Sequence, residues 1–547
     1  MNVNSGELFR TSNSMIALLS RPVPRDYHFD PSYPPEEVCH ILDVVGKLHI
    51  GRRSGTGLPF GPSIARHIIR STWNNACKWM TAIIRRLVDR HHSPETPEGF
   101  RMRNKSLIVL RMVLKSSSEG SGDIWNGPNS QHRSVFATNP QLVSIAVDTC
   151  YTLADIQHPL FEPLWSQIEV LYEDQRDDLL VHARHAHLTR GYDLPRIGVR
   201  LLVSEVVKAT IDTSALLAAV EFFNAVYASS PEAGSTLMSN NGLHWLTHAF
   251  RIVPHRSHTI LPNDYRLAKL CMKEIATGLK QVVQGGYSFA TDVVRGRTLR
   301  SMARTLSLNE ILSADGDIFT LSLSYSRLIE DLSPFLIFRT FAIAVMKECD
   351  FLRRAGLLNS SLDRLLEDAQ SMERDWTAFR ASGKDWVCCS SDCNTPPEKR
   401  PIITLKQCSK CRVAMYCSVE CQRHDWCINH RNQCSRYPTP VSGCSYHISV
   451  RDEAFMKFRA HRDMIQMHED IQSQPQSMVI HVDYSHTRPK VISLSFEETI
   501  GQFRESTVDI QLRSEKDCMD ESEEVLVLLH YPGSGRQPLV YRERLFG

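Results

Sequence analysis

Apolar residues recur at helical intervals over much of the first two-thirds of the chain. Between Ile64 and Leu87 they return every three to five positions, and the segments Ala215–Tyr227, Tyr265–Val283 and Leu362–Phe379 show the same habit. This spacing places the apolar side chains on one face of an α-helix. Short polar breaks separate the segments, as expected where antiparallel helices follow one another closely. The pattern therefore predicts a long, mainly α region.

The helical pattern also suggests a domain plan. Residues 1–33 are rich in Ser, Asn, Arg and Pro, which predicts a flexible N-terminal arm. Residues 34–380 predict a helical domain, either α-solenoid-like of the armadillo or HEAT type or an irregular helical arrangement, since no clean repeat period distinguishes the two. Within this domain, the Ser/Gly/Asn-rich residues 115–134 predict a mobile loop.

The pattern changes again in residues 445–547, which predict a small α+β C-terminal domain. Asp452–Ile471 has the pattern of one amphipathic helix. Alternation of apolar and polar residues, clearest in Val491–Phe496, then predicts short strands of a mainly antiparallel sheet. The predicted strands are Met478–Tyr484, Val491–Phe496, Val508–Leu512, Val525–Tyr531 and Leu539–Tyr541.

Composition places the chain among ordinary globular proteins. Its 547 residues are too many for a single core, and 42% hydrophobic with 23% charged residues does not favour disorder. The formal net charge of +2 argues against a protein that mainly coats nucleic acid or an anionic membrane. The longest apolar run near the N-terminus, Met15–Leu19, is too short for a signal or membrane segment. We therefore expect a soluble intracellular protein, with nucleus and cytoplasm left open.

Cysteine placement changes this picture. Of 16 cysteines, ten lie between Cys388 and Cys444, and the other six are scattered singly through apolar patterns. A tight cluster with short regular spacings indicates a metal site. The cluster contains four successive donor pairs, which are Cys388/Cys393, Cys408/Cys411, Cys417/Cys421 and His430/Cys434.

Four such pairs suit two zinc ions. A structural Zn²⁺ takes four Cys or His donors in a tetrahedron, with Zn–S near about 2.3 Å, and leaves no position for substrate. The cluster therefore predicts two structural Zn²⁺ ions that stabilise a segment too short for much core of its own. Cys417 and Cys421 fall one turn apart on a predicted short helix, Ser418–Trp426. A small treble of zinc-bound knuckles and short helices is the expected fold.

The segment Trp386–Cys434 resembles the MYND-type zinc finger, in the form found in fungal members. The resemblance rests on Cys-x2-Cys, Tyr-Cys-x3-Cys-Gln, and then Trp, His and Cys in order. It covers less than a tenth of the chain. The resemblance implies interleaved sites, with one ion on Cys388, Cys393, Cys417 and Cys421, and the other on Cys408, Cys411, His430 and Cys434.

Two departures from the commonest family pattern leave alternatives open. The first pair is Cys-x4-Cys or Cys-x3-Cys, so either Cys388 or Cys389 is the first ligand. The Trp-x-Cys-x4-Cys pattern resembles fungal members of the family, and this resemblance favours Cys388. One extra residue separates Trp426 from His430, which keeps His424 and Cys427 as rival donors.

The same resemblance implies a peptide-binding groove at Gln422 and Trp426. An exposed indole packs on a proline ring, and a neighbouring amide can hydrogen-bond an extended peptide backbone. The competing interpretation is that Trp426 only covers the small core of the finger.

Other candidate sites are weaker. His182, His185 and His187 fit a solvated surface better than a metal site, and Gly51–Gly61 lacks the Lys and Ser/Thr of a phosphate-binding loop. Residues 384–436 carry nine basic and five acidic residues, but seven thiolates and two Zn²⁺ reduce the net charge to about +1. That charge is too small for a strong nucleic-acid footprint.

These observations favour an interaction adaptor without catalytic residues, in which the finger holds a partner protein's proline-containing peptide in a regulatory or transcriptional complex. No membrane or nucleic-acid partner is expected. A lysine methyltransferase of the SET type is one alternative, because some MYND fingers are inserted in SET domains. A SET domain would need its own cofactor-binding and substrate-binding motifs outside the finger, and the sequence shows none. In the other alternative the finger is a structural clamp between the helical and C-terminal domains.

Overall fold

The computed structural model describes residues 140–544 with gaps. The predicted arm at 1–33, the apolar stripe at Ile64–Leu87 and the predicted loop at 115–134 lie outside the described residues. The remaining gaps are 159–160, 173–191, 256–264, 313–317, 397–403, 412, 435–447, 467–477, 487–489, 504–507, 509–510, 515–523 and 533–537.

The chain divides into two compact units, residues 1–205 with 214–234, and residues 206–213 with 235–547. In the described part of the first unit, Phe222 meets Trp165 and Tyr151 edge to face, with ring centroids 5.1 and 5.8 Å apart. All three rings are almost fully buried and form the centre of this unit's core. Its helices are α7 (Pro140–Asp155), α8 (Phe161–Tyr172), α10 (Leu194–Val206) and α11 (Thr213–Ser229).

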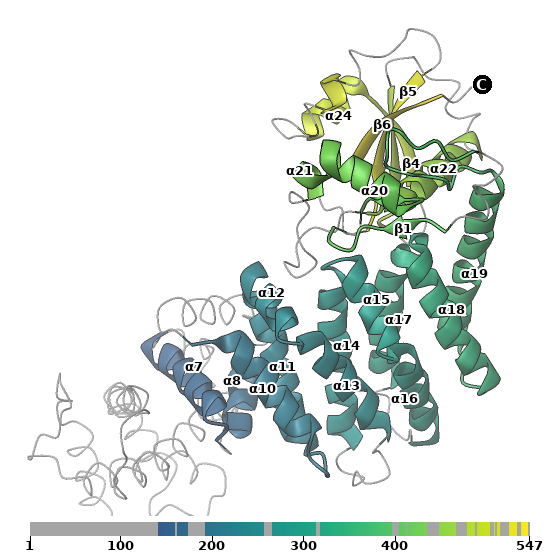
Figure 1. Ribbon diagram of the computed structural model, residues 1–547. Coiled ribbons are helices and arrows are strands. Elements are labelled where there is room, and N and C mark those ends of the chain that lie inside the picture. The colour runs from purple at the N-terminus through teal and green to yellow at the C-terminus, as the bar shows by residue number, and fades with distance from the viewer. Residues whose placement is uncertain are drawn as a thin grey trace, which may run out of the picture. The chain divides into compact units, whose positions relative to one another are not determined.

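The second unit begins with a series of helices that Figure 1 labels in order. Helix α14 packs against α13 and α17, and α18 packs against α15 and α19. The predicted helices at 215–227, 265–283 and 362–379 are confirmed, and so is the mainly α fold class. The elements are α12 (Pro231–Ser239), α13 (Gly242–His255), α14 (Tyr265–Val283), α15 (Tyr287–Arg295), α16 (Thr298–Leu312), α17 (Ile318–Leu332), η3 (Ser333–Ile337), α18 (Arg339–Arg354) and α19 (Ser360–Ala381).

Helix α19 shows how local sequence sets these elements. Asn359 caps its N-terminus by accepting a 2.9 Å hydrogen bond from the backbone N–H of Leu362. The helix ends before Gly383, whose φ of 69° is a conformation that glycine adopts without strain. Its buried face includes Leu362, Leu365, Leu366, Ala369, Trp376 and Phe379. This stripe has the helical period seen in the sequence.

The C-terminal part combines helices with a four-stranded sheet of order β4-β3-β5-β6. The outer pairs are antiparallel as predicted, but the central pair β3–β5 is parallel. The predicted strand Val508–Leu512 is wrong, because Val508 and residues 511–514 are helical. The predicted amphipathic helix Asp452–Ile471 is confirmed up to Gln466 as α22, and its last five residues lie outside the described residues. The elements are α22 (Val450–Gln466), β3 (Met478–Asp483), β4 (Lys490–Ser495), α24 (Phe496–Gln502), β5 (Glu524–His530) and β6 (Leu539–Arg544).

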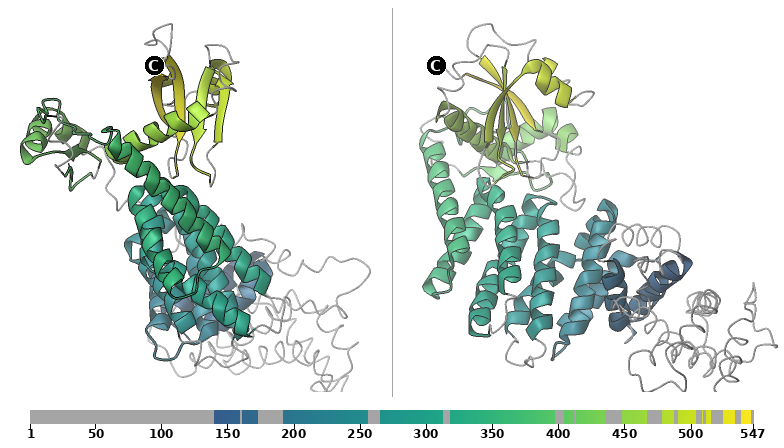
Figure 2. Two further views of the ribbon diagram at one scale, coloured as in Figure 1. Left: turned by 90° about the vertical axis from the view of Figure 1, so that its right-hand side faces the viewer. Right: turned by 180° about the vertical axis from the view of Figure 1, so that it is seen from behind.

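Both faces of the central strands are covered, so β3 and β5 are apolar at successive positions. On one face Val479 and Leu526 pack with Phe496 of α24. On the other, Lys457 of α22 lies over the ring of Tyr541, 5.0 Å from its centroid. Figures 1 and 2 show the sheet between α24 and α22. Among the helices that the structure describes, none is long and apolar enough to cross a membrane.

Candidate metal centre and binding surface

The finger is built from one small hairpin and three consecutive short helical segments. The backbone N–H of Cys408 donates a 2.9 Å hydrogen bond to the carbonyl of Ala414, which closes the hairpin. The Ser418 side chain accepts from the N–H of Cys421 and starts the first helix. The elements are β1 (Lys406–Gln407), β2 (Met415–Tyr416), α20 (Val419–Asp425), the π-helical turn η5 (Trp426–His430) and α21 (Arg431–Cys434).

The first donor cluster joins the start of the finger to α20. Its four Sγ atoms lie within 4.8 Å of one another. The Sγ of Cys417 is 3.7 Å from that of Cys388, 3.6 Å from that of Cys393 and 3.4 Å from that of Cys421. The first and third of the sequence pairs therefore meet at one point.

The second donor cluster contains Cys408, Cys411, His430 and Cys434, and all four residues are buried. The sulfur atoms of Cys408 and Cys434 are 3.9 Å apart, and the Sγ of Cys411 is 3.5 Å from Nε2 of His430. This cluster joins the hairpin to η5 and α21. The two clusters therefore interleave along the chain.

The spacing of the donors fits zinc. Tetrahedral coordination at a Zn–S distance of about 2.3 Å places two sulfur ligands about 3.8 Å apart. The measured S–S separations of 3.4–3.9 Å lie close to this tetrahedral edge. Each cluster supplies four Cys or His donors. The two clusters therefore have the donor number and chemistry of two structural zinc ions.

The structure separates the rival donors from these clusters. The Sγ of Cys389 accepts a hydrogen bond from the N–H of Met415 at 3.4 Å, and Cys389 packs against the finger's core. Cys427 is exposed on η5. Nε2 of His424 lies 2.9 Å from Oδ2 of Asp392. Within the described residues, none of these three side chains belongs to either four-donor cluster.

The thiols in each cluster titrate unequally. Burial raises the pKa of Cys388 to about 12 and that of Cys434 to about 11. Burial also opposes ionisation of Cys393 and Cys408, but hydrogen bonds outweigh it. Bonds from Thr395 lower the pKa of Cys393 to about 7, and those from the backbone N–H of Cys411 help lower that of Cys408 to about 6. A divalent cation at the centre favours the ionised form of all the thiols.

A buried hydrogen bond links the hairpin to the end of α20. The hydroxyl of Tyr416 donates to Oδ2 of Asp425 at 2.7 Å, and both residues are buried. Burial and this bond raise the pKa of Tyr416 above its ordinary range. Asp425 directly precedes Trp426, so the bond holds the end of α20 next to the exposed indole.

The extra residue between Trp426 and His430 is absorbed by a π-helical turn. Residues 426–430 form η5, and His430 at its end is only 2% exposed, inside the second cluster. A π-turn accommodates one additional residue within a helix. The insertion therefore leaves the histidine among the donors.

Three apolar side chains of α20 and η5 are exposed. Trp426 is 36% exposed, Val419 40% and Ile428 55%, whereas Gln422 is half-buried. The indole of Trp426 also contacts the ring of His430, edge to face at 5.7 Å. Trp426 thus both packs on the second cluster and faces solvent. Gln422 and Trp426 are four residues apart on one continuous helical stretch, which places them on the same side.

Sequence reasoning missed Val419 and Ile428 as surface residues. Their apolar character beside Gln422 and Trp426 was visible, but only the coordinates show that both are exposed. The remaining candidates, His182, His185, His187 and Gly51–Gly61, lie outside the described residues.

Comparison with known proteins agrees with this geometry. A family model described as MYND finger matches residues 388–434, so this segment is a MYND-type zinc finger, a module that binds zinc and mediates protein interactions. A search of curated proteins gives no match. Among solved structures, the chain is similar to one titled "Crystal Structure of SYS-1 at 2.6A resolution". The two are 12% identical, the match covers 72% of this chain and 84% of that one, and the TM-score is 0.24.

Proposed function

We propose that this chain is a protein-interaction adaptor whose finger holds an extended, proline-containing peptide of a partner across α20 and η5. Such a partner would belong to a regulatory or transcriptional complex. The chain itself carries out no reaction in this proposal. Two Zn²⁺ ions hold the finger in shape, one on Cys388, Cys393, Cys417 and Cys421, and the other on Cys408, Cys411, His430 and Cys434.

The observation that carries the proposal is the exposed indole of Trp426 on a rigid support. Its edge rests against His430, and Asp425 before it is tied to Tyr416. A ring fixed in this way loses little conformational entropy when it packs against a proline. The amide of Gln422, one turn earlier, can donate to and accept from an extended backbone.

The coordination supports binding rather than catalysis. Each proposed ion takes four protein donors, which leaves no coordination position for a substrate or an activated water. Zinc here contributes folding energy to the finger. The peptide-binding residues are therefore the side chains on the outer face of α20 and η5, and the ions act by keeping these elements in place.

The alternative is a purely structural finger. The backbone N–H of Val450, in the first turn of α22, donates to the carbonyl of Val413 at 3.2 Å. Arg451 pairs with Asp385 at 2.7 Å, immediately before the finger. These contacts attach the finger to α22, but they leave the outer face of α20 and η5 uncovered.

The test compares the intact protein with a Gln422→Ala/Trp426→Ala double variant. Captured partners are quantified, and a proline-containing peptide from the partner is then titrated into both proteins. We expect at least about tenfold weaker peptide binding in the variant, because a central aromatic contact typically contributes about 2 kcal/mol or more. Zinc content near two per chain and an unchanged melting temperature establish that the variant is folded.

The matched control is Ile492→Ala, which removes an apolar side chain that is 53% exposed on β4, outside the finger. It should leave peptide binding unchanged. Equal binding by the intact protein and the folded double variant would reject the groove and favour the structural alternative. Measurable binding of S-adenosylmethionine by the intact protein would instead favour a methyltransferase.

A further inference from the structure

The finger lies in the sequence between two helices that contact each other directly. Helix α19 ends at Ala381 and α22 begins at Val450. The indole of Trp376 in α19 stacks on the ring of Phe455 in α22, with centroids 3.8 Å apart and planes 13° from parallel. Phe379 adds an edge-to-face contact with Phe455 at 5.6 Å. All three rings are at most 1% exposed, so this contact is a closed apolar core.

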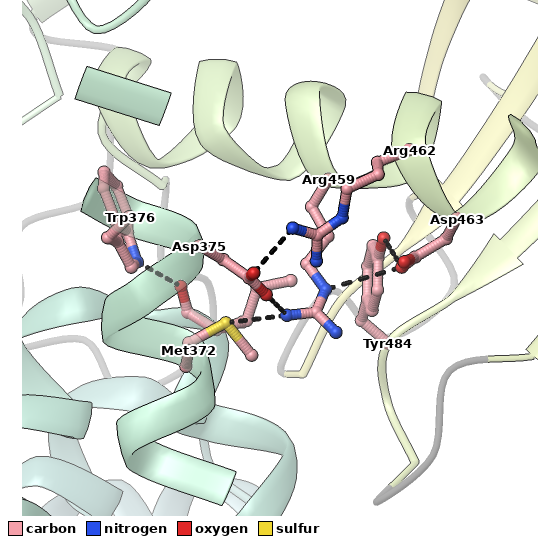
Figure 3. Close-up of polar contacts among 8 residues, drawn as sticks. Met372, Asp375, Trp376, Arg459, Arg462, Asp463 and Tyr484 are labelled. Atoms are coloured by element: carbon pink, nitrogen blue, oxygen red, sulfur yellow. Dashed lines mark hydrogen bonds and ion pairs between the residues drawn. The ribbon is translucent and has the colours of Figure 1, made fainter. Parts of the chain in front are cut away.

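A polar network flanks this aromatic core (Figure 3). Oδ1 of Asp375 accepts from Nη1 of Arg462 at 2.6 Å, and Oδ2 of Asp375 pairs with Arg459. The Asp375 carboxylate is only 11% exposed and Arg459 only 16%. Two arginines therefore reach from α22 to a single carboxylate on α19, and a buried charge of this kind is stable only while it is paired.

The network continues from α22 into the sheet. Nε of Arg459 lies 3.4 Å from Oδ2 of Asp463, and the same oxygen accepts from the hydroxyl of Tyr484 at 2.7 Å. Tyr484 directly follows β3, and its backbone N–H donates to the carbonyl of His530 in β5 at 2.9 Å. Figure 3 shows Asp375, Arg459, Asp463 and Tyr484 in one continuous set of polar contacts.

The network also reaches back into the preceding helices. The indole N–H of Trp376 donates to the carbonyl of Ile337 in η3 at 3.4 Å. Arg339, the first residue of α18, pairs with Glu373 of α19 at 2.9 Å. Residues on both sides of the finger are thus joined without any finger residue taking part.

The finger's own attachments are fewer and lie at its margins. Among the described residues they include the Val413–Val450 backbone hydrogen bond and the Asp385–Arg451 ion pair, both at the first turn of α22. The remaining contacts of β1, β2, α20, η5 and α21 are mainly with one another. The finger also has a small core, made by its buried cysteines, Val413, Ala414 and Tyr416, and Val450 of α22 packs against the edge of this core.

We infer that the α19–α22 contact, and not the finger, joins the helices α13–α19 to the C-terminal sheet. The finger is then an insertion between α19 and α22 that folds and unfolds independently of them. Zinc then controls the finger alone. Loss of both ions unfolds the binding module and leaves the rest of the second unit folded. The fold of the interaction surface on the finger therefore depends on zinc, whereas the fold of the helices and the sheet to which the finger is attached does not.

The experiment uses the full chain in reducing buffer, with and without a strong zinc chelator. Hydrogen exchange is followed separately in the finger, in α19 and α22, and in β3 and β5. We expect chelation to remove protection throughout α20, η5 and α21. Protection in α19, α22 and the sheet should remain, and the melting temperature of the body should shift by no more than about 4 °C.

Phe455→Ala is the complementary variant. It should retain two zinc ions and finger protection, while protection is lost together in α19, α22 and the sheet. The inference is overturned if chelation exposes α19, α22 and the sheet as extensively as Phe455→Ala does. It is also overturned if Phe455→Ala leaves their protection intact.

A second variant replaces residues 388–446 by a flexible Gly/Ser linker of about 15 residues, whose mean span is about 20 Å. We expect it to melt cooperatively near the temperature of the chelated full chain. Collapse of this variant's α19–α22 protection would contradict the inference. Partner capture plays no part in these measurements, so their outcome is independent of whether the finger binds a peptide.

Discussion

The hydroxyl of Tyr416 lies 2.7 Å from Oδ2 of Asp425, and both side chains are buried inside the finger. Tyr416 belongs to the hairpin that carries two metal-cluster cysteines, and Asp425 ends the helix that leads into Trp426. One hydrogen bond therefore connects the hairpin of the finger to the end of the helix that precedes Trp426.

Tyr416→Phe should weaken the finger without touching a donor of either cluster. The substitution leaves the carboxylate of Asp425 buried without its partner, which costs about 1–3 kcal/mol or more for a charged group. We expect zinc to pass to a competing chelator at a lower chelator concentration. Tyr484→Phe is the matched control, because it removes another 2.7 Å Tyr–Asp bond outside the finger. If both variants release zinc as the intact protein does, Tyr416 does not stabilise the finger.

The two adjacent cysteines at the start of the finger should behave differently. Cys388→Ser removes a sulfur that lies 3.7 Å from Cys417 in the first cluster, so the zinc content should fall from two ions per chain to about one. Cys389→Ser removes a thiol that accepts a backbone hydrogen bond from Met415, and should retain two. Metal analysis after gel filtration measures both ratios. The reverse result would assign the first ligand to Cys389.

The finger could be predicted far better than its surroundings because its determinants are local. Donor pairs with two to four residues between their members place both members at one ion, whatever the rest of the chain does. The sequence favoured Cys388 but left Cys389 open, because it does not show which of the two thiols faces the hairpin. The sequence shows the extra residue between Trp426 and His430, but it did not predict that a π-helical turn accommodates this residue.

Contacts between residues far apart in the sequence could not be predicted for the rest of the fold. The periodicity of Tyr265–Val283 predicted α14 with its bounds, because a long helix repeats one signal many times. Val508–Leu512 alternates apolar and polar residues over only five positions, which is too short to separate a strand from a helical turn. The successive apolar residues of β3 and β5 indicate strands covered on both faces, but they do not specify that these two strands pair in parallel. Asp375 and Arg459 are 84 residues apart, and only the fold reveals that they pair.

Phe455→Ala should strongly destabilise the contact between α19 and α22. The ring is fully buried between Trp376 and Phe379, and truncating such a side chain typically costs about 3–5 kcal/mol. Urea unfolding followed by far-ultraviolet circular dichroism measures the loss. Ile465→Ala is the control on the same helix, since that side chain is 45% exposed and its removal should change the free energy of unfolding by no more than about 0.5 kcal/mol. Similar losses in the two variants would contradict the assigned core.

The C-terminal sheet should lose stability as the pH falls below neutrality. His481 on β3 is 5% exposed, with Nε2 3.1 Å from the hydroxyl of Thr499 and its ring 6.2 Å from that of His530. Burial, reinforced by His530 and opposed by Asp483, lowers the pKa of His481 to about 4. The ordinary value is about 6.5, so between these two pH values the unfolded chain binds a proton that the folded chain does not.

Because the unfolded chain binds more protons in this range, the folded state becomes less stable as the pH falls. The stabilisation from neutral His481 is complete above pH about 6.5 and is lost progressively as the pH falls towards 4. Burial lowers the pKa of His530 as well, so it acts in the same direction. Hydrogen exchange of the β3 and β5 amides at pH 7, 6 and 5, corrected for intrinsic rates, measures the effect. In His481→Gln, which keeps a side-chain amide for Thr499, the slope of stability against pH should be smaller by up to one proton per chain. An unchanged slope would show that the folded chain protonates His481 as readily as the unfolded chain does.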